Sequence, residues 1–230
     1  MKTNNKYSTG LEQFENAVEQ IINAGNCSDF PVPEFVKFTR EDDTAISIKP
    51  RLLGNWLESV DESNGVYFLD FSTFETYELY YSGPASEKLL EMNMSHVRNK
   101  YEDPKKQFLD NLIFDLTLFN TDEPIVVWGK PLFEDALKQV SELYYEYSDE
   151  VDCILERLVD MEQVFTEQLF LDSKFRGNTV KTVHSGFFPS YRGKIESISI
   201  AMYDIYEALE SIYFELPIQL AELTGIHIAA

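Results

Sequence analysis

The stretch Val66-Tyr67-Phe68-Leu69-Asp70-Phe71 is apolar except for one acid near its end. A short apolar run that is bounded by turn residues predicts a strand buried in a sheet. Residues 61–65, Asp-Glu-Ser-Asn-Gly, are a strong turn signal directly before it. A second aromatic run follows at residues 74–81. We therefore expect a hairpin in which residues 66–71 form a central strand.

Helical and strand patterns alternate after this hairpin. Asp103-Pro104 predicts a helix start, because aspartate is a favoured N-cap and proline suits the first turn. Residues 125–128 are an apolar run between a proline and a glycine, and they predict a strand parallel to residues 66–71. This order predicts an α/β fold in which helices cover a mixed sheet. Further helical patterns fill most of residues 132–165 and residues 198–214, the last expected to end before Pro217.

The first sixty residues carry a pattern of their own. The expected elements are a helix at residues 11–22, strands at 34–39 and 44–48, and a helix at 51–60. None of them carries recognisable chemistry. We therefore predict a small α+β extension over residues 1–60, packed on a main domain over residues 61–230.

Composition narrows the class of protein. The chain has 230 residues with 19 basic and 40 acidic side chains, a net charge of −21, and 44% of it is hydrophobic. Such a hydrophobic fraction supports a sizeable core and excludes disorder as the main state. The negative charge opposes sequence-independent DNA binding, which requires a basic footprint. Because neither a membrane span nor the apolar core of a signal peptide is evident, we expect a cytoplasmic protein.

Charge is unevenly distributed along the chain. Residues 134–172 hold twelve acids and two cations, and residues 173–195 hold no acid. The second segment interleaves cations with aromatic residues, as sites for single-stranded nucleic acid do. The alternative is a surface loop, with His184 in it, whose aromatic residues anchor it to the core. The candidate nucleic-acid-binding residues are Lys174, Arg176, Lys181 and Arg192.

The acidic segment is a second candidate surface. Its charge would attract a basic protein, because exposed charges steer association over long range. The alternative is that this charge serves only solubility. The candidate partner-binding residues are Glu142, Glu146, Asp149 and Glu150, in what the pattern predicts to be a solvated helix-and-turn surface.

Five short patterns occur in a fixed order along the chain. They are residues 66–74, Asp103-Pro104-Lys105 followed by Phe108, residues 126–129 followed by Phe133-Glu134, Arg157-Leu158-Val159-Asp160-Met161 followed by Phe165, and residues 177–183. In this order and spacing they resemble the bacterial domain-of-unknown-function family 2779, and the resemblance covers roughly residues 52–213.

That family is similar in turn to RNase H-like exonucleases of the DEDD type, in which acids from several elements hold two metal ions. The resemblance implies an RNase H-like mixed sheet flanked by helices. It implies Asp70 at the first metal-binding position, Glu134 at the third and Asp204 on the closing helix, with Glu207 as the alternative to Asp204. Asp160 would orient the site. Two divalent cations, Mg²⁺ or Mn²⁺, about 4 Å apart would stabilise the attacking and leaving oxygens of a phosphodiester.

The chain departs from the family's pattern at two places, because the Asn implied before Phe133 is absent, and the more important departure is at position 72. Ser72 stands where the resemblance implies a glutamate, and a neutral hydroxyl cannot neutralise a second cation. Two functions therefore stay open. The first is a non-catalytic acidic protein without a cofactor, which binds or inhibits a nucleic-acid-processing or defence protein. The second is a Mg²⁺- or Mn²⁺-dependent 3′–5′ exonuclease that acts on single-stranded DNA or RNA.

Overall fold

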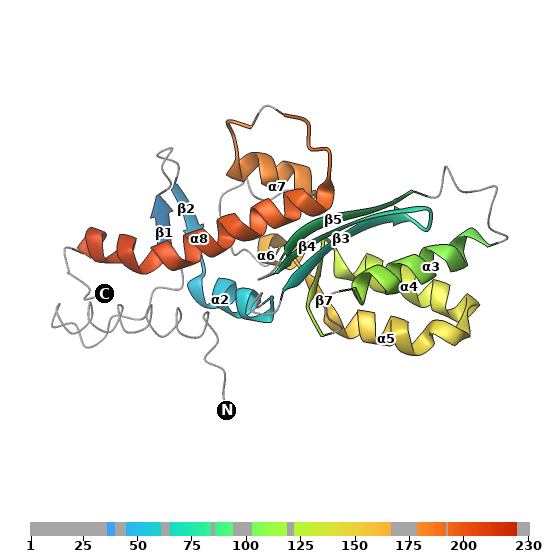
Figure 1. Ribbon diagram of the computed structural model, residues 1–230. Coiled ribbons are helices and arrows are strands. Elements are labelled where there is room, and N and C mark those ends of the chain that lie inside the picture. Colours follow the sequence, from blue (N-terminus) through green and yellow to red (C-terminus); the bar gives the residue numbers. More distant parts are fainter. Residues whose placement is uncertain are drawn as a thin grey trace.

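The computed structural model describes residues 36–39, 45–60, 65–83, 86–93, 103–118, 122–166, 179–191 and 193–224. Within these ranges, five strands form a mixed sheet in the order β5-β4-β3-β6-β7, with helices on both faces (Figure 1). The α/β fold predicted from the sequence is therefore confirmed. The strands are β3 (Val66–Thr73), β4 (Thr76–Gly83), β5 (Ser86–Asn93), β6 (Ile125–Val127) and β7 (Leu158–Asp160).

β3 is the central strand, as the sequence predicted. It pairs antiparallel with β4, and β4 pairs antiparallel with β5. On its other side β3 pairs parallel with β6, and β6 pairs parallel with β7. The predicted parallel pairing of the two apolar runs is confirmed, with Tyr67 opposite Ile125 and Phe68 opposite Val126.

One face of the sheet carries Val66 and Phe68 of β3, because successive side chains of a strand point to opposite faces. Phe68 packs against Tyr206 with 5.7 Å between the ring centroids, and both side chains are fully buried. The helices that contribute to this core are α2 (Pro50–Ser59), α6 (Glu162–Thr166), α7 (Val180–Phe187) and α8 (Ile198–Thr224).

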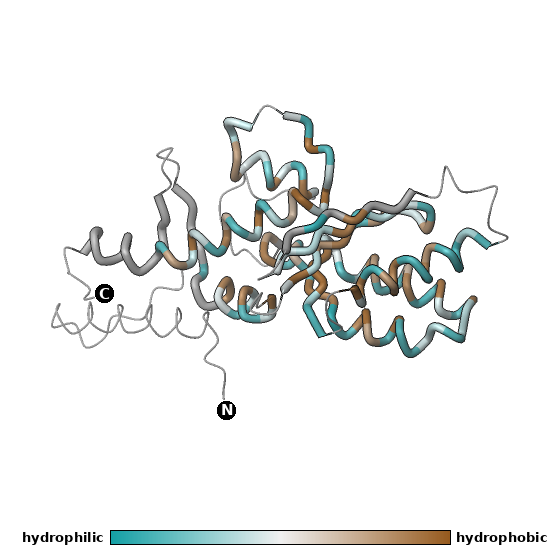
Figure 2. The backbone as a smooth tube through the Cα atoms, viewed as in Figure 1, coloured by the Kyte–Doolittle hydropathy of each residue, from teal (hydrophilic) through white to brown (hydrophobic). Residues whose placement is uncertain are grey.

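The opposite face carries Tyr67 and Leu69, which are also fully buried. Asp103 caps the first helix on this face as predicted, because its side chain accepts a hydrogen bond from the backbone N–H of Lys106. Hydrophobic residues gather where the helices meet the sheet (Figure 2). The elements of this layer are α3 (Pro104–Leu116), α4 (Lys130–Leu143), the short 3₁₀ helix η2 (Tyr145–Tyr147) and α5 (Ser148–Arg157).

The N-terminal part contributes an antiparallel pair, β1 (Val36–Thr39) and β2 (Ala45–Ile48), with β1 against α8 (Figure 1). These strands agree with the prediction, whereas the helix expected at residues 11–22 lies outside the described residues. Helix α2 places Leu53 and Leu57 in the same core as Phe68. The division into an extension over residues 1–60 and a main domain stays a prediction.

Three local predictions differ from the structure. His184, expected in a loop, is 3% exposed on α7, because Val180, Val183 and Phe187 give that segment a buried helical face. Helix α8 continues past Pro217 to Thr224, so this proline is accommodated within a helix although it lacks the N–H donor and crowds the preceding turn. Strand β7 lies inside the segment predicted to be helical. No helix in the described part of the chain has the length and apolar character of a membrane span.

Candidate functional site

Asp70 is a predicted site acid whose pKa is raised by its surroundings. It lies in β3 opposite Glu78 of β4, and strand alternation places it on the face that α7 and α8 cover. Partial burial and the neighbouring charge of Glu78 raise the pKa of Asp70 to about 6, against a smaller opposing effect of Lys181. A carboxyl group with a raised pKa near the carboxyl end of a strand is a candidate functional group.

Glu78, the neighbour of Asp70, holds the start of α8. Its Oε2 atom accepts hydrogen bonds from the Ser197 hydroxyl at 2.9 Å and from the Ile198 backbone N–H at 2.7 Å. A carboxylate at a helix N-terminus satisfies free N–H groups and is stabilised by the helix dipole. Glu78 therefore has a structural role, and its fixed charge opposes the ionisation of Asp70.

Asp204 on α8 pairs with a buried histidine. Its Oδ2 atom lies 2.9 Å from His184 Nε2. The His184 ring contacts the rings of Phe188 and Tyr191, and its Nδ1 atom has no hydrogen-bond partner within the described residues. The alternative acid, Glu207, accepts a hydrogen bond from the Tyr203 hydroxyl at 2.7 Å. Both acids that were predicted on the closing helix thus have partners of their own.

Glu134 belongs to the other side of the sheet. It lies on α4, whose Phe133 packs against Phe71 with 4.7 Å between the ring centroids. Its carboxylate is 3.6 Å from Lys130 Nζ and 3.5 Å from Lys138 Nζ, one turn away on either side. These two ion pairs occupy the carboxylate with cations of its own helix.

The predicted metal ligands are consequently not brought together as a set. Among the described residues, no group of three or more His, Cys, Asp or Glu side chains could hold a metal ion. Ser72, the position that lacks the implied glutamate, is exposed at the end of β3. A two-metal site requires several converging carboxylates, so the donor set of the described residues does not fit one.

Asp160 orders the ends of two parallel strands. Its Oδ1 atom accepts hydrogen bonds from the Gly129 N–H at 3.0 Å and from the Glu162 N–H at 2.9 Å. Gly129 has a φ of +81°, which favours glycine. Burial and the charge of Asp160 raise the pKa of Glu162. This arrangement is compatible with the orienting role predicted for Asp160.

Of the four candidate nucleic-acid-binding residues, the structure describes only Lys181. Lys181 is exposed on α7, close enough to Asp70 to lower its pKa. Lys174, Arg176 and Arg192 lie outside the described residues, so the proposed basic surface stays a prediction.

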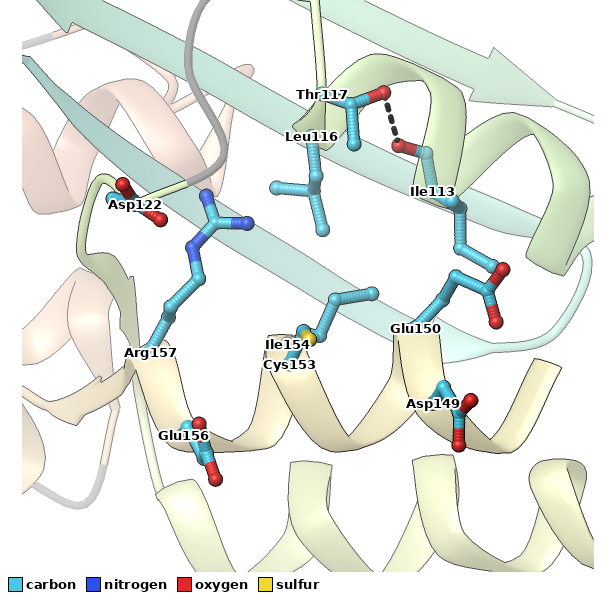
Figure 3. A pocket seen from close by; sticks show the side chains of 10 residues that line it. All are labelled: Ile113, Leu116, Thr117, Asp122, Asp149, Glu150, Cys153, Ile154, Glu156 and Arg157. Carbon is cyan, nitrogen blue, oxygen red and sulfur yellow. Dashed lines mark hydrogen bonds between the residues drawn. The ribbon is translucent and has the colours of Figure 1, made fainter.

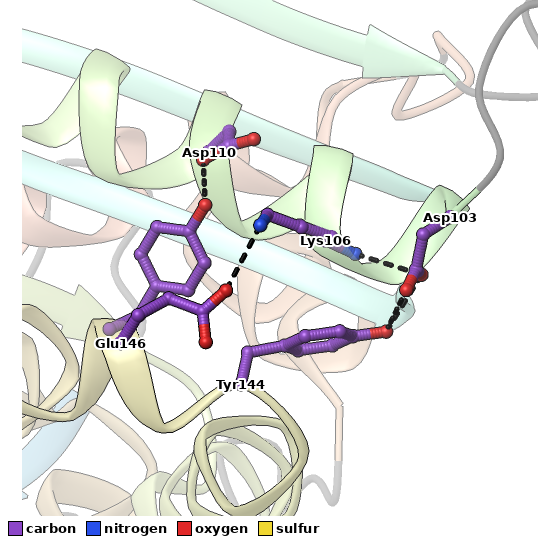
Figure 4. A network of polar contacts seen from close by, with 6 residues as sticks. Asp103, Lys106, Asp110, Tyr144 and Glu146 are labelled. Atoms are coloured by element: carbon purple, nitrogen blue, oxygen red, sulfur yellow. Dashed lines mark hydrogen bonds and ion pairs between the residues drawn. The ribbon is translucent and has the colours of Figure 1, made fainter.

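The predicted partner-binding acids lie together around the turn from α4 to α5. Glu142, Glu146, Asp149 and Glu150 are all exposed, and we call them the acidic surface. Glu146 pairs with Lys106 Nζ at 2.9 Å. Next to it, the Tyr144 hydroxyl donates to Asp103 at 2.7 Å (Figure 4). These contacts join the acidic surface to the start of α3.

A pocket of about 420 Å³ opens between the end of α3 and helix α5. Apolar side chains of Ile113, Leu116 and Ile154 line it, together with Glu150 of the acidic surface and Arg157 (Figure 3). The sequence did not reveal this pocket, because its walls come from segments about 40 residues apart. The only signal was the run of acids that contains Glu150.

Comparison with known protein families gives one result. Residues 67–180 match the model of a family described as Domain of unknown function (DUF2779). No curated protein and no solved structure matches the chain. The resemblance inferred from the five patterns is therefore confirmed over residues 67–180.

Proposed function

We propose that this protein is a non-catalytic, cytoplasmic binding protein that uses the acidic surface to bind a basic partner, which we expect to be a nucleic-acid-processing or defence protein. The observation that carries the proposal is the state of the predicted metal ligands. Glu134 is held by Lys130 and Lys138, and Asp204 is held by His184. Two of the three predicted metal ligands, Glu134 and Asp204, thus have partners of their own, whereas the acidic surface is exposed.

We further propose that the sheet is an RNase H-like core. The support is its arrangement: a central antiparallel hairpin strand, β3, has a parallel neighbour, β6, as that fold requires. A binding protein on this core would retain the scaffold of an exonuclease without its metal-binding carboxylates. Fold alone does not determine function, so the proposal depends on the exposed charges.

The exposed surface also has apolar residues among its acids. Leu143 is 61% exposed and Tyr145 is 83% exposed, and both are adjacent in sequence to acids of the acidic surface. Tyrosine is enriched among the residues that dominate binding energy at interfaces, and surrounding charges set the partner and the association rate. Charge and an aromatic contact together favour a protein partner over a role in solubility alone.

The test is a pull-down from host lysate with wild-type protein and with a variant in which Glu142, Glu146, Asp149 and Glu150 are all replaced by glutamine. We expect a basic protein to be recovered by the wild type at low salt, less of it at moderate salt, and little by the variant. Circular dichroism should show both proteins equally folded. Recovery that is indifferent to all four changes would contradict the proposal.

A second candidate, the metal-dependent exonuclease, is favoured by Asp70. Its raised pKa, its position near the carboxyl end of β3 and the nearby Lys181 are features of an active site. Under our proposal, purified protein with Mg²⁺ or Mn²⁺ should not degrade single-stranded DNA or RNA. Degradation by the wild type that Asp70→Ala abolishes would establish the second candidate instead.

A further inference from the structure

The pocket between α3 and α5 has an apolar wall and charged ends. Ile113 and Leu116 face it from α3, and Ile154 faces it from α5 (Figure 3). Its volume of about 420 Å³ is within the range of pockets that bind small ligands or side chains. Apolar walls next to water favour an occupant that has apolar atoms of its own.

The charges in the pocket are not equivalent. Glu150 extends from α5 toward Ile113, whereas Asp149 and Glu156 point away from α3 (Figure 3). Glu150 therefore places a negative charge at one end of the apolar wall. The Arg157 guanidinium lies at the other end, beside Asp122.

Arg157 is held in place by contacts with residues that do not line the pocket. Its Nε atom donates to the Glu123 backbone carbonyl at 2.7 Å, and its guanidinium lies over the Tyr67 ring at 5.7 Å. Its Nη2 atom is buried and has no hydrogen-bond partner within the described residues. A buried donor without a partner is unfavourable, so the guanidinium retains hydrogen-bonding capacity that its own contacts do not use.

We propose that this pocket binds a basic peptide segment of the partner. A lysine or arginine side chain would lie along Ile113 and Ile154 through its aliphatic stem and place its cation at Glu150. A backbone carbonyl of the same segment would approach the Arg157 guanidinium where it lines the pocket. The inference rests on the proposed function, since it assigns the recognition element to the basic partner.

A peptide fits these features better than a free polyamine. A polyamine carries cations along its whole length, and one of them would meet the positive charge of Arg157. A peptide offers a cation for Glu150 and a carbonyl oxygen for Arg157, separated by apolar atoms. The other acids at the rim of the pocket, Asp149 and Glu156, would attract further basic residues of the segment.

The probe is a short fluorescein-labelled peptide of alternating lysine and leucine, and binding is measured by fluorescence polarisation. A salt concentration of about 0.1 M is used, because the Debye length is then about 10 Å and general attraction is reduced. Glu150→Gln removes the carboxylate in the pocket. Glu58→Gln is the matched control, because it removes the same charge from an exposed position on α2 that belongs neither to the acidic surface nor to the lining of the pocket. Cys153→Trp adds bulk at a lining residue without changing the charge.

We expect saturable binding that Glu150→Gln weakens about fivefold, as loss of a partly desolvated ion pair would. Glu58→Gln should weaken binding less than about twofold, and Cys153→Trp should weaken it at least as much as Glu150→Gln. Equal effects of the two Glu→Gln changes, with no effect of Cys153→Trp, would overturn the proposal that the pocket binds the peptide and would leave the proposed function unaffected. Absence of peptide binding would also overturn the proposal that the pocket binds a basic peptide. The pull-down tests the proposed function separately. Displacement of the peptide by an equal concentration of spermidine would show that the pocket prefers a polyamine and would overturn the proposal of a peptide ligand.

Discussion

Replacement of Asp70 by asparagine should stabilise the protein at neutral pH. Asp70 is half-buried and faces the fixed charge of Glu78, and these two effects raise its pKa from 3.8 to about 6. The folded state therefore binds a proton more tightly than the unfolded state does. Stability should fall as pH rises from about 4 through 6, since the carboxyl group then ionises in an unfavourable environment.

The expected magnitude follows from the pKa. A carboxyl group whose pKa rises from 3.8 to about 6 on folding reduces the free energy of unfolding by about 3 kcal/mol once it is fully ionised. Asp70 keeps part of its surface in solvent, which screens the charge, so we reduce the figure to about 1–2 kcal/mol. Asp70→Asn should recover this amount at pH 8 and about half of it at pH 5, between the two pKa values.

Urea denaturation of the two proteins at pH 8 and pH 5 measures the effect. Asp135→Asn is the control, because it removes one negative charge from an exposed position on α4. Our reasoning would be refuted if Asp70→Asn were no more stable than Asp135→Asn at pH 8. An equal advantage at both pH values would refute it as well, since the effect would then not come from ionisation.

Two further substitutions test the contacts that position the site and the acidic surface. Asp103→Ala should lower the free energy of unfolding by about 1–2 kcal/mol in urea denaturation, because Asp103 caps α3 and accepts a hydrogen bond from the Tyr144 hydroxyl. Tyr144→Phe should lower it less, because the cap of α3 remains. Equal stability of Asp103→Ala and the wild type would contradict the capping role. Gly129→Ala should lower the melting temperature and reduce the free energy of unfolding by about 1–2 kcal/mol. The reason is that Gly129 has a φ of +81° and that a Cβ atom there would lie 3.2 Å from the Glu162 carboxylate. An unchanged melting temperature would contradict this prediction and show that the turn tolerates a side chain.

Much of the sheet could be predicted because its strongest signals are local. The apolar run of β3 and the apolar residues of β6 between Pro124 and Gly129 each specify a buried strand without reference to the rest of the chain. β7 could not be predicted in this way, because its three residues lie between helical patterns. The helical spacing of Val180, Val183 and Phe187 was a signal for α7, but the cations and aromatic residues interleaved in this segment favoured a loop interpretation.

The environment of the candidate site could not be predicted, because it depends on contacts between distant segments. Glu78 accepts from Ile198, which is 120 residues away, and His184 pairs with Asp204 across the packing of α7 on α8. The family pattern supplied Asp70, Glu134 and Asp204 as positions. It could not show that Glu134 lies on the other side of the sheet from Asp70, although the pairs of Glu134 with Lys130 and Lys138 are local contacts one helical turn away.

The association rate with the recovered partner, measured at low and moderate salt, tests the central proposal most directly. If the acidic surface binds a basic protein, the rate constant of the wild type should fall by about tenfold or more as salt rises, because salt screens long-range attraction. The variant with glutamine at Glu142, Glu146, Asp149 and Glu150 should associate more slowly at low salt and approach the wild type at high salt. Rate constants that do not respond to salt, and that are equal for the two proteins, would contradict the account.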